Sequence, residues 1–313
     1  MASEYAKHFG LTDTPFARCQ NPRWLYLSAQ HKETILKTRW AVEEHAGLVL
    51  WRADVGMGKS SLIEYLMTVW PKQFGWLCAK LQNTGSISGP RALVSEVVSA
   101  FGLEPEATTR KMVTQLENWL LARVIEDNRN VVLFIDEAQS IASKAFPVIR
   151  DLINLQTRDR ILMQIVMVGQ TNVDRRLRNF PALRSRIASA STLHPLSYDE
   201  CDAMLLHRLE MAGAFDPFKI YSSKAVRAIY DHSNGVPRDF VVLAEAAMKE
   251  AFLRDAQRVE FEHVQQALLS LAGRNDYLPD LGDGEAPAIL PLRAISRAAA
   301  STLQQMAAYA KAA

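Results

Sequence analysis

The sequence predicts an α/β fold, in which a parallel sheet is flanked by helices and followed by a small α-helical domain. Three observations support this prediction. Four short apolar runs alternate with segments of helical periodicity up to about residue 196. Such runs are typical of parallel strands covered on both faces. A glycine-containing loop separates the first run from a helix, and beyond residue 197 only helical patterns remain.

Composition limits the classes of protein to which the chain can belong. Hydrophobic residues make up 49% and charged residues 22% of the 313 residues, which is typical of a soluble globular protein. No stretch reaches the roughly 18 uninterrupted apolar residues of a membrane helix. The N-terminus contains no apolar signal core. We therefore expect a cytoplasmic protein that has no membrane partner.

Charge and cysteine content limit the kinds of site to expect. The formal net charge is +2, so any contact with nucleic acid requires basic residues concentrated on one surface. The three cysteines, Cys19, Cys78 and Cys201, are odd in number and far apart, and no two have metal-ligand spacing. Neither a disulfide framework nor a zinc site is expected.

The patterns divide the chain into four parts. These are an N-terminal segment and helix at 1–46, an α/β domain at 47–196, a helical domain at 197–273, and a linker with a C-terminal Ala-rich helix at 274–313. Apolar runs predict strands at 47–51, 75–81, 131–135 and 161–168. Helical spacing predicts helices at 30–45, 59–69, 91–101, 110–126, 199–212, 222–232, 238–254 and 260–272.

The last part of the chain permits two interpretations. Residues 274–291 are rich in acidic residues, glycine and proline, which indicates a linker. Residues 292–312 contain no acidic residue, and Leu292, Leu303 and Met306 fall near one helical face. This helix either docks on its own chain or is offered to a partner.

The loop after the first strand has the pattern of a phosphate-binding P-loop. It lies between a strand and a helix, and reads Ala53-Asp54-Val55-Gly56-Met57-Gly58-Lys59-Ser60, followed by Ser61. Backbone N–H groups from Val55 to Ser61 would bind the phosphates of ATP. Lys59 would reach the outer phosphates, and the hydroxyl of Ser60 would ligate Mg²⁺. The strict pattern has glycine in place of Ala53, whose methyl group fits if φ is negative.

Two adjacent carboxylates follow the third apolar run. Val131–Ile135 leads directly into Asp136 and Glu137, the pattern of a Walker B strand. Carboxylates at the end of a buried strand are costly unless they meet a cation or water. Asp136 would bind Mg²⁺ directly or through water, and Glu137 would polarise the attacking water as general base. With the P-loop, this motif predicts an enzyme that hydrolyses ATP to ADP and phosphate.

The fourth strand ends in a run of polar residues that would lie between these two motifs. The run reads Gly169-Gln170-Thr171-Asn172. A polar side chain at this place could sense the γ-phosphate of ATP, and we favour Gln170 over Thr171 and Asn172.

Arginines at two places complete the expected site. Leu183-Arg184-Ser185-Arg186 offers an arginine finger for the ATP site of a neighbouring subunit, because a guanidinium offsets the charge of the transferred phosphoryl group. Arg186 is the preferred candidate and Arg184 the alternative. Arg238 follows Pro237 at the start of a helix, where it could contact the phosphates from the helical domain.

These motifs together resemble the ExeA/GspA-like and TnsC-like group of AAA+ ATPases. The resemblance covers about residues 5–273. Its motifs are the P-loop, Phe9-Gly10-Leu11 with Pro15-Phe16, the run from Asn21 to Ser28, Ile135-Asp136-Glu137-Ala138-Gln139, the run from Val166 to Gln170, and Gly235-Val236-Pro237-Arg238. It implies an AAA+ core with a helical lid, and ATP with Mg²⁺ as cofactors.

The group has two branches, and the sequence favours one of them. Secretion ATPases of the first branch typically carry a transmembrane segment after the core, whereas only a polar linker and a short helix follow Gly273 here. Transposition regulators of the second branch form rings or helical filaments around double-stranded DNA and connect target selection to the transposase. We expect a homo-oligomer of this second kind, with double-stranded DNA, a transposase and target-selection proteins as partners.

The resemblance also implies which segments face the DNA. They follow the second strand and the next helix, and they contain Lys80, Arg91, Thr108, Thr109, Arg110 and Lys111. The best candidates for phosphate contacts are Arg91, Thr109, Arg110 and Lys111. A solvated helix start without DNA remains an alternative for each of them. An ATP-driven switch or secretion-assembly ATPase that acts on proteins without DNA is the alternative function.

Overall fold

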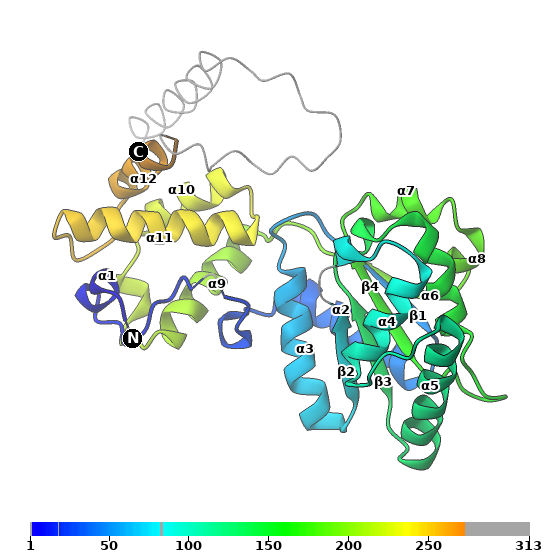
Figure 1. The fold of residues 1–313 in the computed structure, drawn as a ribbon. Helices are drawn as coiled ribbons and strands as arrows, with labels where there is room; N and C mark the ends of the chain where they lie inside the picture. The colour runs from blue at the N-terminus through cyan, green and yellow to red at the C-terminus, as the bar shows by residue number, and fades with distance from the viewer. Residues whose placement is uncertain (1, 18, 82–83, 273–313) are drawn as a thin grey trace. The chain divides into compact units, whose positions relative to one another are not determined.

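The computed structural model describes residues 2–17, 19–81 and 84–272 (Figure 1). The linker and Ala-rich helix expected at 274–313 lie outside these residues. Among the helices described, none is both long and apolar enough to cross a membrane.

Five parallel strands form the central sheet, in the order β2-β3-β4-β1-β5. Their bounds are β1 Leu48–Arg52, β2 Leu77–Leu81, β3 Val131–Ile135, β4 Gln164–Gly169 and β5 Ile187–Thr192. The α/β fold class is therefore confirmed. The fourth strand begins three residues later than expected, because Ile161 pairs with Gln156 in an isolated bridge before the strand starts.

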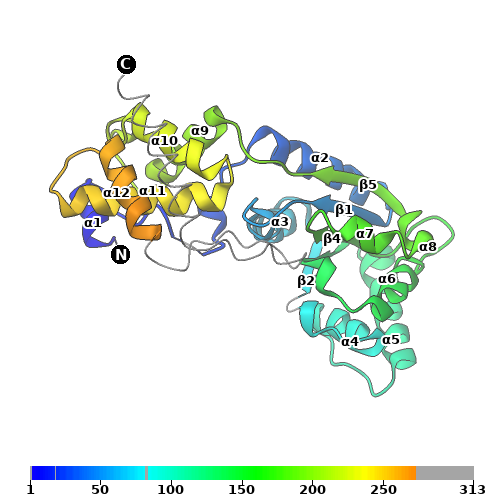
Figure 2. The same ribbon diagram turned by 90° about the horizontal axis from the view of Figure 1, so that it is seen from above.

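The alternating side chains of the strands are buried on opposite faces of the sheet. Leu50, Leu133 and Met167 join a hydrophobic core with residues of α4 (Pro90–Ala100), α5 (Thr109–Leu121) and α6 (Phe146–Ile153). Trp51, Phe134 and Val168 join a second core, with residues of α2 (Ala29–Glu43) and α3 (Lys59–Phe74). Figure 2 shows α2 and α4 on opposite sides of the strands. This double burial explains why the strands are apolar without alternation.

Helices after residue 197 form the second group of elements. They are α9 Tyr198–Met211, α10 Ser223–Ser233, α11 Pro237–Leu253 and α12 Phe261–Ala272, close to the ranges expected from periodicity. Each of the first three begins at a serine or a proline suited to a helix start, with Ser197 and Ser222 accepting hydrogen bonds from backbone N–H groups.

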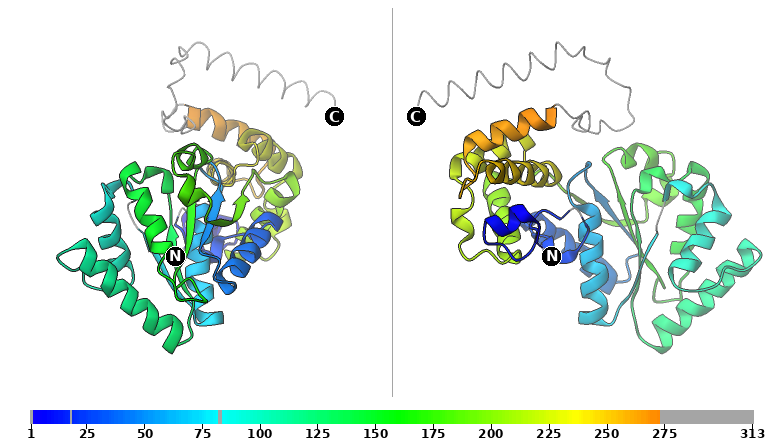
Figure 3. Two further views of the ribbon diagram at one scale, coloured as in Figure 1. Left: turned by 90° about the vertical axis from the view of Figure 1, so that its right-hand side faces the viewer. Right: turned by 60° about the vertical axis from the view of Figure 1, so that its left-hand side comes forward.

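The start of the chain packs against these later helices. Helix α1 (Glu4–His8) contacts α11, and the Thr12 hydroxyl donates to the Ala212 carbonyl over 3.0 Å. Arg208 of α9 donates to the carbonyl of Pro15, also over 3.0 Å. Figure 3 shows the blue N-terminal helix beside the yellow α11. The predicted boundaries at 46 and 196 stay predictions, but α1 and the segment from Thr12 to Pro15 pack against the helical group.

Candidate active site

The P-loop connects β1 to α3 at the carboxyl edge of the sheet. Helix α3 begins at Lys59, and its N-cap is Gly58, which has a φ of 85° and no side chain to cap the helix. The first N–H groups of α3 are therefore not occupied by a side-chain cap, as anion binding at a helix start requires. Ala53 is buried and has a negative φ, so its methyl group is accommodated as expected.

Lys59 is folded back over its own loop. Its Nζ donates to the carbonyls of Ala53 and Asp54, over 2.8 and 2.9 Å. Burial lowers the pKa of this ammonium group, while the carboxylates of Glu137 and Asp136 act in the opposite direction. Phosphate oxygens are charged acceptors and compete well with these neutral carbonyls. The side chain is thus close to the carboxylates of Glu137 and Asp136 and able to turn to a nucleotide.

Ser60 and Asp136 bring their oxygens together across the P-loop and β3. The Ser60 hydroxyl donates to Oδ2 of Asp136 over 2.6 Å, and Asp136 is 8% exposed. Mg²⁺ prefers oxygen ligands and is held by one or two protein groups plus phosphates and water. No group of three acidic or metal-binding side chains occurs in the described part of the chain. The two oxygens of Ser60 and Asp136 therefore fit Mg²⁺ held together with a nucleotide.

Lys80 of β2 is part of this site. Its Nζ lies 3.6 Å from Oδ2 of Asp136 and 3.1 Å from Oε1 of Glu64 on α3. Lys80 was expected among the DNA-facing segments, whereas it pairs with the Walker B carboxylate of Asp136. The available signal was a lysine within an otherwise apolar strand, which requires an acidic partner.

Glu137 has an unusual backbone conformation. Its φ is 50° and its ψ is 43°, the left-handed region that non-glycine residues rarely occupy. Hydrogen bonds hold it there: its N–H donates to Oδ1 of Asp136, and its carbonyl accepts from the Thr84 hydroxyl over 3.3 Å. The side chain accepts from Nε2 of Gln139. The carboxylate lines the cavity beside the P-loop.

The polar end of β4 reaches both motifs. The N–H of Gln170 donates to Oε1 of Gln139 over 3.1 Å, and the Thr171 hydroxyl donates to Asp54 of the P-loop over 2.8 Å. The Thr171 hydroxyl is thus engaged with the P-loop, while the Gln170 side chain is half-buried. That Gln170 senses the γ-phosphate stays a prediction. Gln139 was not among the expected site residues, although it is part of the run Asp136-Glu137-Ala138-Gln139 and contacts both Glu137 and Gln170.

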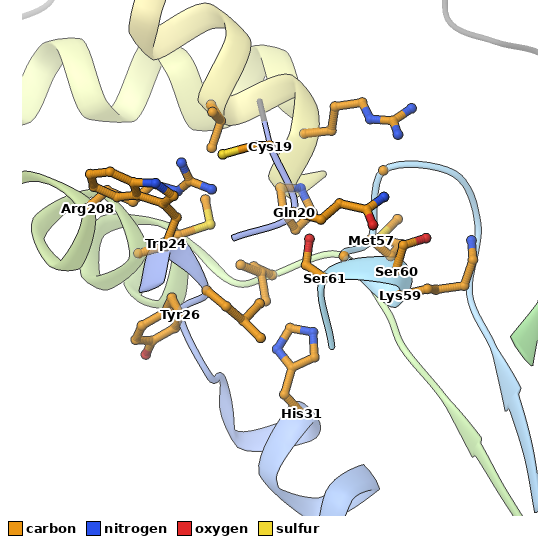
Figure 4. A pocket seen from close by; sticks show the side chains of 18 of the residues that line it. Cys19, Gln20, Trp24, Tyr26, His31, Met57, Lys59, Ser60, Ser61 and Arg208 are labelled. Carbon is orange, nitrogen blue, oxygen red and sulfur yellow. The ribbon is translucent and has the colours of Figure 1, made fainter. Parts of the chain in front are cut away.

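A cavity of about 460 Å³ opens beside the P-loop (Figure 4). Trp24 and Arg208 lie at one end, and Lys59 and Ser60 lie at the other. His31 lines the cavity with an Nε2 atom that is buried and has no hydrogen-bond partner among the described residues. Its Nδ1 is 2.9 Å from the Ser28 hydroxyl, and burial lowers the pKa of the ring. Aromatic walls next to a phosphate-binding loop suit a purine nucleotide.

Arg238 reaches the same cavity from the start of α11. Its N–H donates to the carbonyl of Gly56 over 3.2 Å. A Cβ atom at Gly56 would lie 2.8 Å from Cγ1 of Val236 and 3.2 Å from Cβ of Arg238. Only glycine at position 56 lets the start of α11 approach the P-loop this closely. The guanidinium is near enough to Lys59 to lower the pKa of its ammonium group.

Arg184 and Arg186 lie at the opposite edge of the sheet. Arg184 ends the short helix α8 (Pro181–Arg184), and β5 starts at Ile187, which pairs with Leu48 at the beginning of β1. The P-loop follows the other end of β1. Both arginines are exposed, and neither side chain forms an ion pair or hydrogen bond within the described ranges. Their position at the far edge removes them from the P-loop of their own chain.

The expected DNA contacts gather at the starts of α4 and α5. The Arg91 guanidinium donates to the carbonyl of Ala107 over 3.1 Å, just before α5 begins at Thr109. Arg110 and Lys111 are exposed, whereas Thr109 is half-buried in the first turn. The structure therefore brings Arg91 close to the start of α5. A role of these four residues in DNA binding stays a prediction.

Comparison with known proteins identifies the domain. A protein-family model described as an AAA domain matches residues 42–177. The chain is 30% identical over 277 residues to General secretion pathway protein A of Aeromonas hydrophila, a match that covers 87% of this chain and 49% of that protein. This chain therefore spans about half the length of that relative.

Two solved structures share the fold. ORC2 of Aeropyrum pernix, in ADPNP-ADP complexes, is 17% identical with a TM-score of 0.63, and the match covers 82% of this chain and 70% of that one. Drosophila ORC bound to DNA is 16% identical with a TM-score of 0.61, and the match covers 86% of this chain and 66% of that one. Sheet, P-loop, Walker B carboxylates and family match agree: the chain carries an AAA+ ATPase domain of the P-loop fold.

Proposed function

We propose that this protein is an ATP-dependent switch that assembles head to tail around double-stranded DNA and regulates DNA transposition, linking target selection to the transposase. The observation that carries the proposal is the placement of the P-loop and of Arg184 and Arg186 at opposite edges of one sheet. In such a subunit, the phosphates of a bound ATP would face one neighbouring subunit, while Arg184 and Arg186 would face the ATP site of another.

ATP hydrolysis follows from the groups that surround the cavity. A water molecule polarised by Glu137 attacks the γ-phosphorus, its proton passes to the Glu137 carboxylate, and the bond from the γ-phosphorus to the bridging oxygen breaks so that ADP leaves. Lys59 offsets the charge of the transferred phosphoryl group. Arg186 of the neighbouring subunit adds a second guanidinium charge. Mg²⁺, when held by Ser60 and Asp136, supplies electrostatic stabilisation of the β- and γ-phosphate oxygens.

Head-to-tail assembly is supported by the same arrangement. A contact that joins two different faces of identical subunits gives a ring if its rotation closes and a helical filament if it does not. Such contacts place Arg184 or Arg186 near the neighbour's γ-phosphate, so assembly and hydrolysis depend on each other.

Binding to double-stranded DNA is supported by the exposed basic residues at the starts of α4 and α5. Arg91, Arg110 and Lys111 gather there, and such side chains suit sequence-independent contacts with phosphates. Drosophila ORC, which shares the fold, was solved bound to DNA. Regulation of transposition is the finer form of the proposal, and it rests on the resemblance to TnsC-like proteins.

A secretion-assembly ATPase without DNA is the second candidate. The specific observation in its favour is the 30% identity to a protein named for general secretion. Both candidates use the same ATP site, so they differ in what the assembled state binds.

The test measures ATPase rate and particle size with ATP or a non-hydrolysable analogue, each with and without double-stranded DNA. Assembly that needs ATP and is stimulated by DNA supports the first candidate. ATP-dependent assembly that is indifferent to DNA excludes it and favours a protein partner. A chain that neither binds nor hydrolyses ATP contradicts both.

A further inference from the structure

We propose that Gln139 is the residue that positions Glu137 for catalysis and connects it to the end of β4. Its side-chain amide is engaged at both ends. Nε2 donates to Oε2 of Glu137, and Oε1 accepts from the backbone N–H of Gln170 over 3.1 Å. The inference rests on the proposed role of Glu137 as general base.

The two hydrogen bonds fix the orientation of the amide. Turning it by 180° would bring its oxygen against the Glu137 carboxylate and its NH₂ group against the N–H of Gln170, which is repulsive at both ends. A hydrogen bond to a charged carboxylate is also among the stronger kinds in proteins. Gln139 therefore has one orientation, and it holds Oε2 of Glu137 while Oε1 is left without a bond to this amide.

The surroundings leave just enough room for this arrangement. A Cβ atom at Gly169 would lie 3.0 Å from Oε1 of Gln139 and 3.1 Å from Cβ of Val173. The last residue of β4 thus provides the space that the amide fills. Glu137 itself is held in a left-handed backbone conformation by contacts of its main chain, so its side chain starts from a fixed direction.

The connection to β4 gives Gln139 a second effect. Gln170 is the expected γ-phosphate sensor, and its own N–H holds the amide that holds Glu137. If Gln170 moves toward a phosphate, the amide of Gln139 moves with it and shifts the carboxylate of Glu137. Position of the base is thereby tied to the presence of a third phosphate.

The test compares Gln139→Leu and Gln139→Glu in the full chain, with MgATP as substrate. Leucine removes both hydrogen bonds at similar size, and glutamate keeps an acceptor for Gln170 while losing the donor to Glu137. We expect kcat to fall about 10- to 100-fold in both variants, the range given by one hydrogen bond to a charged group. The Kd for a fluorescent ATP analogue should stay within about twofold, because no phosphate contact is removed.

Gln30 supplies a matched control. Its amide also bridges two backbone groups, donating to the carbonyl of His194 and accepting from its N–H, both over 2.8 Å, and it does not line the catalytic cavity. Gln30→Leu removes the same kind of side chain and should keep kcat within about twofold of wild type. Equal losses of kcat in Gln30→Leu and Gln139→Leu would reduce the role of Gln139 to general stability and overturn the proposal.

A double-mutant cycle with Glu137→Gln separates this inference from the proposed function. If Gln139 acts through Glu137, adding Gln139→Leu to Glu137→Gln lowers the residual single-turnover rate no further. Independent, additive losses, or a wild-type kcat in Gln139→Leu, contradict the positioning role. A wild-type rate in Glu137→Gln alone contradicts the assignment of the base, whatever Gln139 does.

Discussion

Replacement of Gly235 by alanine tests how the structure brings Arg238 to the P-loop. Gly235 has a φ of 75°, and a Cβ atom there would lie 2.2 Å from the carbonyl oxygen of Leu196. The backbone N–H of Leu196 donates to the carbonyl of Gly235 over 2.8 Å, so a hydrogen bond joins the two chain segments at this point. Alanine at 235 must push them apart.

The expected loss of folding free energy in Gly235→Ala has two parts. A left-handed conformation costs an L-residue about 1 kcal/mol or more. Loss of the Leu196–Gly235 hydrogen bond, with two backbone groups left without partners, adds about 2 kcal/mol. The free energy of unfolding should therefore fall by about 3 kcal/mol. Tm should fall by about 5 °C, because the entropy of unfolding of 313 residues is about 0.66 kcal/mol/K.

Gly75 supplies a matched control for the strain alone. Its φ is 68°, and a Cβ atom there would meet nothing within 4 Å. Gly75→Ala should lower the free energy of unfolding by about 1 kcal/mol, the left-handed cost without the overlap. Thermal melting of both variants, with and without nucleotide, measures the difference. The Kd for a fluorescent ATP analogue should rise in Gly235→Ala, because the start of α11 moves away from Gly56.

Two outcomes would refute this reasoning. If Gly235→Ala melts no lower than Gly75→Ala, the overlap with Leu196 does not exist in solution. If Gly235→Ala is destabilised but binds nucleotide as wild type does, the position of Arg238 has no part in nucleotide binding.

Two sets of substitutions and one chemical labelling also test the site and its surroundings. Glu137→Gln should lower the ATPase rate by about 100-fold or more, since water is no longer polarised, while ATP binding persists and the assembled state is trapped in size-exclusion chromatography. Arg110→Ala with Lys111→Ala should weaken binding to double-stranded DNA and reduce the salt slope by about 2, as expected from two lost phosphate contacts. Native maleimide labelling near neutral pH should modify Cys19 alone, and ATP should slow it because Cys19 lines the cavity.

The DNA-binding and labelling tests each have a control within the chain. Arg158→Ala with Arg160→Ala removes the same charge from an exposed loop before β4, and an equal loss of DNA affinity there would discredit the α5 contacts. For the labelling, burial raises the pKa of both Cys78 and Cys201 to about 12, so their thiols stay protonated in the folded chain. Rapid labelling of either cysteine would contradict this burial. A wild-type ATPase rate in Glu137→Gln would remove Glu137 from the role of general base.

The sequence was sufficient for the elements whose patterns are strong. Strand β3 and the helices after residue 197 fall within one or two residues of their predicted bounds, because continuous apolar runs and helical periodicity are local signals. Strand β5 was missed, since Ile187–Thr192 contains one large apolar residue and its burial comes from pairing with β1. Its place at the edge of the sheet is a property of the fold, which the local pattern does not reveal.

The residues of the site also divide into those that the sequence predicted and those that it did not. The proximity of Lys59, Ser60 and Asp136 was predictable because the P-loop and the Asp136-Glu137 pair each follow a strand directly, and parallel strands end at the same edge of the sheet. Lys80 and Gln139 were not, since their partners are far apart in the sequence or on another element. Side chains that act by holding other side chains leave weak sequence signals, and only the packed structure shows what they touch.

The cavity beside the P-loop draws its walls from parts of the chain outside the AAA domain match. That match ends at residue 177, while Trp24, Tyr26 and Arg208 line the cavity from either side of it in sequence. The P-loop and the rest of the cavity wall therefore belong to separate stretches of the chain. A family match to residues 42–177 alone carries no information about the wall that Trp24, Tyr26 and Arg208 form.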